Sequence, residues 1–149
     1  MSDAHANLAY ANVTNSPGLA GGVITVTTGY GAIFPATPFN CTVWPASTIP
    51  TSTNAEIVRV TNIVGDSLAV SRAQEGTSAV NIAATYQIAN TITAKTITDI
   101  ELYLPSVGVG SPEGVVTRGP GTPYMDTATN SLWIKRTGTG NTGWLQLIA

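Results

Sequence analysis

The chain carries few of the side chains that enzymes use for nucleophilic or metal chemistry. His5 is the only histidine of the 149 residues, and Cys41 is the only cysteine. A Ser-His-Asp triad needs a histidine held against the nucleophile, and His5 lies in a segment of small residues with little to hold it. Zinc needs three or four protein ligands in close array. We therefore expect no metal site, and we interpret Cys41 as a small buried apolar residue.

Pairs of carboxylates are the remaining candidates for catalysis, because glycosidases place two carboxyl groups across a cleft. The candidate pairs are Asp99 with Glu101 and Asp66 with Glu75. The first pair is better explained as the start of a helix, where the helix dipole favours anions. Glu75 is better explained as a loop residue that pairs with Arg72. We expect no catalytic residue, no cofactor and no enzymatic activity.

A segment rich in glycine and proline, residues 105–114, does not have the spacing of a phosphate-binding loop. Gly108 and Gly110 are followed by Gly114, which departs from the G-x-G-x-x-G spacing, and no βα unit precedes them. The composition instead predicts a linker between two modules.

Aromatic side chains are the clearest candidates for recognition. Stacking on sugars is one role, since aromatic residues are common at recognition surfaces, and the candidates for it are Trp44, Trp133, Trp144 and Tyr124. Filling a core or a subunit interface is the alternative that we favour. The last three lie in a tail of about forty residues, which is too small to bury enough apolar surface alone. We therefore predict that Tyr124, Trp133 and Trp144 form an interface between copies of the chain.

Composition favours a contact protein over a soluble enzyme. Charged residues make up 9% of the chain and hydrophobic residues 43%, whereas an ordinary soluble domain has about 25% charged residues. The net charge of −2 provides no basic face, so we expect no nucleic-acid partner. The N-terminal residues lack the basic and apolar runs of a signal peptide, and no apolar run reaches the roughly 18 residues of a membrane span. We therefore expect folding in a cytoplasm and no membrane partner.

Residue patterns predict an all-β fold. The strongest signal is a hairpin over residues 56–64 and 67–72, joined by Gly65-Asp66. Other strands are expected at residues 23–28, 86–92, 115–117, 124–126, 132–135 and 144–148. Four prolines are expected to confine the strands near them to edges or short pieces: Pro35, Pro38, Pro45 and Pro50. One short helix is expected within residues 93–104, ended by Pro105.

These elements predict four segments. Residues 1–20 form a loose arm, disordered or laid against a neighbour, in which Leu8, Tyr10 and Val13 are the apolar anchors. Residues 21–104 form a β-sandwich or barrel with the short helix. Residues 105–114 are the linker, and residues 115–149 form a small β module whose apolar surface is buried between copies of the chain.

Two blocks of the N-terminal part resemble structural proteins of tailed bacteriophages. The first block covers residues 32–45 and the second covers residues 54–77. The second block contains the strand Glu56-Ile-Val-Arg-Val60, the Gly65-Asp66 turn and the loop Arg72-Ala-Gln-Glu-Gly-Thr77. Residues 92–100 continue the resemblance.

The C-terminal part is similar to a second phage module, which is found in tail fibres and related virion appendages. Its pattern here is Pro112-Glu-Gly-Val-Val116, Gly121, Tyr124 with Asp126, Leu132-Trp-Ile-Lys135, and Gly138 to Trp144. Together the two resemblances cover most of residues 20–149.

The resemblance implies a virion protein, a short trimeric fibre or fibre adaptor on the tail or baseplate, which acts by assembly. This chain has neither the shaft of long fibres nor an obvious receptor-binding tip, so a short attachment or capping role is expected ahead of host attachment through a receptor. Its partners would be two further copies of itself and other virion proteins of tail, baseplate or capsid. Residues 21–104 would dock by shape and by strand pairing, and residues 115–149 would intertwine in the trimer. One alternative is a capsid decoration protein or head fibre. Another is a carbohydrate-binding receptor-recognition module, with a host surface glycan as its partner.

Overall fold

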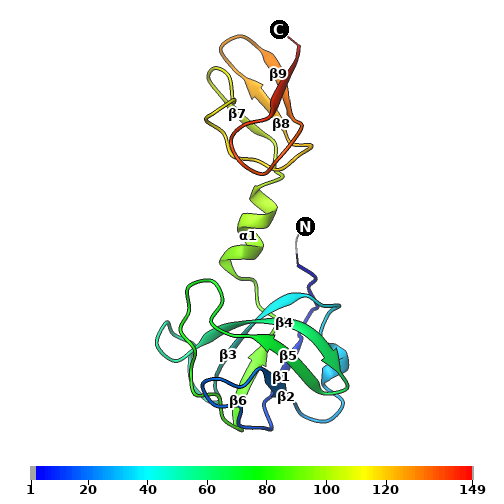
Figure 1. Cartoon of the computed structure of the whole chain (residues 1–149), viewed down its shortest axis with the longest axis vertical. Coiled ribbons are helices and arrows are strands. Elements are labelled where there is room, and N and C mark those ends of the chain that lie inside the picture. The colour runs from blue at the N-terminus through cyan, green and yellow to red at the C-terminus, as the bar shows by residue number, and fades with distance from the viewer. Residues whose placement is uncertain (1–2, 149) are drawn as a thin grey trace. The chain divides into compact units, whose positions relative to one another are not determined.

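A computed structural model describes residues 3–148 and shows a mostly β protein, in agreement with the predicted fold class. The described residues divide into two compact units, an N-terminal unit (residues 3–94) and a C-terminal unit (residues 95–148). Figure 1 shows the larger sheet in the first unit and the helix and the smaller sheet in the second. The boundary falls at the start of the helix rather than in the predicted linker, residues 105–114.

The N-terminal unit is a six-stranded sheet with the order β1-β6-β3-β4-β5-β2. Its strands are β1 (Tyr10–Asn12), β2 (Val23–Thr25), β3 (Phe39–Pro45), β4 (Glu56–Val64), β5 (Ser67–Ser71) and β6 (Tyr86–Ala89). All neighbouring strands are antiparallel. A short 3-10 helix, η1 (Gly31–Ile33), follows β2.

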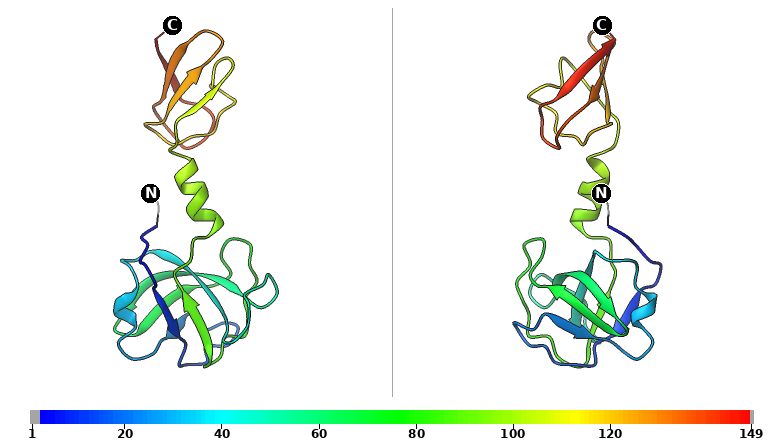
Figure 2. Two further views of the ribbon diagram at one scale, coloured as in Figure 1. Left: turned by 180° about the vertical axis from the view of Figure 1, so that it is seen from behind. Right: turned by 45° about the vertical axis from the view of Figure 1, so that its right-hand side comes forward.

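The larger sheet is strongly curled (Figure 2), and a bridge between Val13 and Val26 joins its two edges. The Thr14 N–H donates to the Thr25 carbonyl (2.8 Å), and the Thr27 N–H donates to the Asn12 carbonyl (3.0 Å). These bonds join the end of β1 to the end of β2, so the unit is a small closed barrel rather than a sandwich. Closure removes the free edges that an open sheet offers for strand pairing.

The predicted hairpin is confirmed, with β4 and β5 joined at Gly65 and Asp66. The Asp66 carboxylate accepts hydrogen bonds from the backbone N–H groups of Gly29 (3.0 Å) and Gly31 (2.9 Å). These two N–H groups hold the pKa of Asp66 below its ordinary value. A side chain at position 31 would collide with the Gly65 carbonyl, so the hairpin turn and the segment before η1 fit together only with glycine there.

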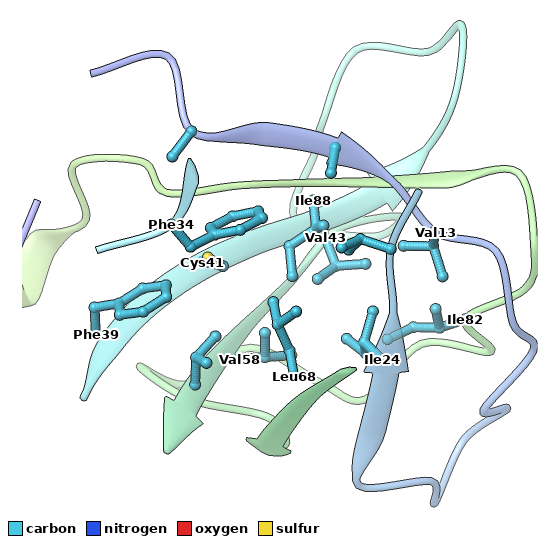
Figure 3. Packing of buried hydrophobic residues seen from close by; sticks show 14 residues of the cluster. Val13, Ile24, Phe34, Phe39, Cys41, Val43, Val58, Leu68, Ile82 and Ile88 are labelled. Carbon is cyan, nitrogen blue, oxygen red and sulfur yellow. The ribbon is translucent and has the colours of Figure 1, made fainter. Parts of the chain in front are cut away.

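The core of the N-terminal unit lies inside the curled sheet (Figure 3). Phe34 and Phe39 stack with ring centroids 6.1 Å apart. Cys41 is completely buried beside them, as predicted, and burial raises the pKa of its thiol. Aliphatic residues from every strand fill the remainder, among them Ile24, Val43, Val58, Leu68 and Ile88.

Two sequence expectations for this unit are wrong, namely the edge position of β3 and the loose N-terminal arm. β3 lies at the centre of the sheet, between β4 and β6, and is not an edge strand. Pro38 precedes β3 and Pro45 is its last residue, so the interior of the strand keeps its N–H donors for pairing.

The expected loose arm is instead part of the barrel. β1 pairs with β6, and Ala11 and Val13 are buried in the core. Leu8, an expected anchor, is 95% exposed. The small side chains at alternate positions fit against the closed sheet, whereas the prediction gave weight only to large apolar residues. Residues 1 and 2 lie outside the described part.

The C-terminal unit begins with helix α1 (Ala94–Glu101), which confirms the predicted helix. Its four-stranded sheet has the order β10-β9-β8-β7, with strands β7 (Ser106–Gly108), β8 (Pro123–Asp126), β9 (Ser131–Lys135) and β10 (Trp144–Ile148). The strands expected at residues 124–126, 132–135 and 144–148 are confirmed. Residues 115–117 form no strand, because the N–H groups of Val115 and Val116 turn back to the Pro112 carbonyl.

Part of the predicted linker is a strand. β7 pairs in parallel with β8, placing Gly108 opposite Asp126. Gly108 has no side chain, which leaves room for the Tyr124 ring to cross it, and the Tyr124 hydroxyl donates to the Gly110 carbonyl (3.2 Å). The glycines of residues 105–114 therefore permit close packing as well as turns.

Candidate assembly surface

Three of the four carboxylates considered for catalysis have a structural contact, and the fourth, Glu101, is exposed at the last position of α1 rather than at the expected start of the helix. Asp66 binds backbone N–H groups, and Asp99 forms an ion pair with Lys95 along the helix. Glu75 accepts a hydrogen bond from the Asn40 side chain (2.6 Å). The expected pairing of Glu75 with Arg72 is wrong, because the Arg72 guanidinium is bound by another carboxylate.

That carboxylate is Glu56, which is completely buried. Its Oε1 accepts from Arg72 Nε (2.8 Å) and from the Ala73 N–H (2.7 Å). Its Oε2 accepts from an Arg72 NH2 group (2.6 Å) and from the Val80 N–H (2.9 Å). Burial alone would raise the pKa of Glu56, but these hydrogen bonds and the Arg72 charge outweigh it and lower the pKa.

Arg72 extends this contact to two loops. Its remaining donors bind three backbone carbonyls, those of Gly18, Gly21 and Val80. The Thr77 hydroxyl closes the second loop, since it accepts from the Ile57 N–H (3.0 Å) and donates to the Gln74 carbonyl (2.8 Å). Glu56, Arg72 and Thr77, all within residues 54–77, thus hold the loops that follow β5 and precede β2.

Two of the three predicted interface residues lie inside the C-terminal unit. Tyr124 and Trp144 are 3% and 9% exposed, and their rings meet edge to face with centroids 5.9 Å apart. Trp144 Nε1 donates to the Val116 carbonyl (3.0 Å). Both rings therefore stabilise the packing of a single chain, and their participation in contacts between chains stays a prediction.

Trp133 is half-buried and lies on the same face of the sheet as the other two aromatic residues. The register places it opposite Tyr124 on β8 and opposite Gln146 on β10. Lys135, two residues further along β9, is buried on this inner face, with its ammonium group 5.7 Å from the Trp144 ring centroid and bonded to the Thr142 carbonyl. The structure thus brings the three predicted aromatic residues together, but on the covered side of the sheet.

Polar loops cover this inner face. Glu113 accepts hydrogen bonds from the N–H groups of Gly143 (3.0 Å) and Trp144 (2.8 Å). These two bonds lower the pKa of Glu113, the one from Trp144 more than the one from Gly143. Asp126 accepts from the Thr129 hydroxyl and from the N–H groups of Gly110 and Ala128, and its pKa is lowered for the same reason.

The opposite side of the same sheet is an exposed apolar surface, which we call the outer face. Two rows of cross-strand neighbours form it. The first row is Val107, Met125 and Leu132, on β7, β8 and β9. The second row is Pro123, Ile134 and Leu145, on β8, β9 and β10.

The outer face is unusual for the surface of a soluble chain because it contains no charged or polar side chain. Val107 is 72% exposed, and Met125 and Leu145 are about 40% exposed. Directly opposed residues on one face of a sheet are close enough for their side chains to touch, so the six residues form one continuous patch. A contiguous apolar patch on an exposed sheet marks an interaction site.

The aromatic residues alone direct attention to the inner face, and the outer face was missed for that reason. The signal that identifies it is a run of consecutive apolar residues in each of three short strands, because neighbouring residues of a strand point to opposite faces of the sheet. Met125 follows Tyr124, Leu132 and Ile134 flank Trp133, and Leu145 follows Trp144. Both parities are apolar, and a strand of this kind is buried on both sides.

Other classes of site find no support in residues 3–148. No group of three or more His, Cys, Asp or Glu side chains in this range could hold a metal ion. The helices of this range are also too short and too polar to cross a lipid bilayer. Comparison of the sequence with protein-family models and with curated proteins found no match.

Proposed function

We propose that this chain is a structural component of a tailed-bacteriophage particle, a short homotrimeric fibre or fibre adaptor on the tail or baseplate, and that it acts by assembly. The observation that carries the proposal is the outer face. An unbroken apolar surface on a small sheet is costly in water and favourable once covered. Copies of the same chain can cover it, because every copy presents the same patch.

The resemblance to phage structural proteins supplies the setting for this assembly. Its motif residues have structural roles here, since Glu56, Arg72 and Thr77 fix loops. The low charge content of 9% agrees with a protein that works by contact.

The two units make different contacts in this proposal. The C-terminal unit holds the copies together, and the N-terminal unit docks on another virion protein. Because the larger sheet is closed, we propose that docking uses the loops and outer surface of the barrel, and not the addition of a strand at its edge.

Immunogold electron microscopy of purified particles tests the proposed function. Label at the tail or baseplate is the expected result. Label on the capsid shell would replace the fibre or adaptor with a decoration protein or head fibre. Absence of label, with the chain abundant in infected cells, would contradict a virion function.

A further inference from the structure

Helix α1 carries a second exposed apolar surface, which the outer face does not include. Ile97, Ile100 and Leu104 are each between 47% and 49% exposed. Helical hydrogen bonding continues past Glu101, since the Tyr103 N–H donates to the Ile100 carbonyl (3.0 Å) and the Leu104 N–H donates to the Glu101 carbonyl (3.2 Å). The three residues therefore lie along one line of the helix, and we call them the helix stripe.

The spacing of the helix stripe is that of a coiled-coil seam. Ile97, Ile100 and Leu104 are separated by three and then four residues, which places them at positions a, d and a of successive heptads. The ion pair between Lys95 and Asp99 lies on another side of the helix. A helix with an apolar line and a polar opposite side is stabilised when the apolar line is covered.

Helix α1 is also too short to be stable without packing. It has eight residues, whereas isolated helices below about 12–15 residues are marginal in water. Thr96 is the only residue of α1 that is buried in the single chain. Covering the exposed side of the helix with another chain would supply the packing that a helix of this length lacks on that side.

We infer that three copies of α1 pack against one another in parallel along the helix stripe. This inference rests on the trimer of the proposed function, and it makes α1 the element that sets the number of chains and their relative direction. Isoleucine at both a and d favours bundles of three or four helices over pairs. The stripe carries no charge, so the same line on another copy is a matching partner.

The parallel direction follows from the residues beside the stripe. Glu101 occupies an e position and Thr96 a g position. In a parallel bundle, e positions are directed toward g positions of the neighbouring helix, so the Glu101 carboxylates of the copies stay apart, while Thr96 itself is covered within its own chain. In an antiparallel arrangement, e faces e, and two Glu101 carboxylates would meet and repel each other.

The C-terminal end of the helix is hydrogen-bonded to the β module, so the direction of the helices also determines the direction of the sheets. The Leu102 carbonyl accepts hydrogen bonds from the Gly119 N–H (2.7 Å) and the Thr122 hydroxyl (3.3 Å). The Tyr103 ring lies so close to Gly119 that a side chain there would collide with it. A parallel bundle therefore places three β modules at the same end.

Disulfide cross-linking of the full chain tests the parallel seam. Ile97→Cys and Leu104→Cys are single substitutions one heptad apart, about 10 Å along the helix. A disulfide requires Cα atoms within about 7 Å. We expect each variant, oxidised alone, to form covalent dimers, with one chain of each trimer left free. Thr98→Cys, exposed away from the stripe, is the matched control and should stay uncross-linked, as should the wild type with its buried Cys41.

The outcomes separate this inference from the proposed function. Cross-linking only in a mixture of the two variants would mean antiparallel helices and overturn the inference. A trimeric mass without cross-linking of either variant, in chains with the circular dichroism of the wild type, would also overturn it and leave the fibre function standing. Cross-linking as expected, with no immunogold label on particles, would support the helix seam and contradict the virion function.

Discussion

The ion pair between Glu56 and Arg72 lies almost entirely out of water, and it shows how single polar residues organise this fold. The Glu56 side chain is 0% exposed and the Arg72 side chain 11%. Removing one partner leaves the other as an uncompensated buried charge, which is strongly destabilising. Asp66, Glu113 and Asp126 act in the same way in other loops, by accepting hydrogen bonds from backbone N–H groups.

Arg72→Ala is expected to lower the free energy of unfolding of the N-terminal unit by about 3–5 kcal/mol. The cause is the loss of the donor for three backbone carbonyls in two loops, together with the unpaired Glu56 carboxylate. Urea denaturation followed by circular dichroism measures the change. Arg136→Ala, at an exposed position, is the control and should change the stability little; equal stabilities for the two variants would contradict the structural role of Arg72.

The stability of the C-terminal unit should depend on pH through the Glu113 carboxylate. Its folded pKa lies below the ordinary value of 4.5, so the unfolded chain takes up the proton first as pH falls. The stabilisation is complete above about pH 4.5 and is lost as pH falls through the folded pKa. We expect the melting temperature of the unit to be level near neutral pH and to fall below pH 4.5.

Glu113→Gln should reduce that acid-dependent fall and lower the melting temperature at pH 7. Thermal denaturation across the acid range, followed by tryptophan fluorescence, measures both effects. Thr139→Ala, at an exposed loop position of the same unit, is the control and should keep the full acid dependence. If the melting temperature of Glu113→Gln fell with acid as steeply as that of the wild type, the contact of Glu113 with Gly143 and Trp144 would not contribute to stability.

Among the structural elements, the outer face and the inner face of one small sheet have opposite roles. The inner face is covered by loops of the same chain, whereas the outer face is uncovered in it. The outer side of β8, β9 and β10 has apolar side chains, whereas their inner side combines aromatic with polar residues. We therefore assign the contacts between chains to the face that includes Met125, Ile134 and Leu145.

Leu145→Glu should weaken self-association by about a hundredfold or more, because a charge would be buried in an apolar contact at a cost of about 3 kcal/mol or more. Sedimentation velocity over a range of protein concentrations measures the change. Val115→Glu is the matched control, since Val115 is an exposed valine in a loop (75%) away from the sheet. Equal association of the two variants would exclude the outer face as the contact.

The sequence predicts elements that have strong local signals. It does not predict strands that form only by pairing with segments far along the chain. The β4–β5 hairpin, helix α1 and β8 to β10 are predicted because periodicity and turns are local. β1 and β7 are missed, because Ala11 and Gly108 have low strand propensity and depend on partners far along the chain. The inner aromatic residues are found by type, but the face that stays exposed depends on loops whose course the sequence does not reveal.

At the scale of the whole molecule, the two units should differ in how they unfold. The N-terminal unit has a closed sheet with its own core, so its stability should not depend on other chains. The C-terminal unit has apolar surfaces that only other copies cover in this account. Association stabilises the folded state by mass action, which makes the melting temperature depend on concentration.

Thermal unfolding of the full chain should therefore show two transitions, of which one moves to higher temperature as protein concentration rises. In a Trp44→Phe variant the two remaining tryptophans, Trp133 and Trp144, both lie in the C-terminal unit, so its fluorescence assigns that transition. A variant with Leu145→Glu should lose the concentration dependence. Two transitions that are both independent of concentration would contradict assembly through this unit.

Native mass spectrometry of the full chain at micromolar concentration tests the central claim, self-assembly into a trimer, most directly. The account predicts a dominant species of three times the 15.3 kDa chain mass. A dominant species at the mass of one chain would contradict it, because both the outer face and the helix stripe would then remain exposed to water.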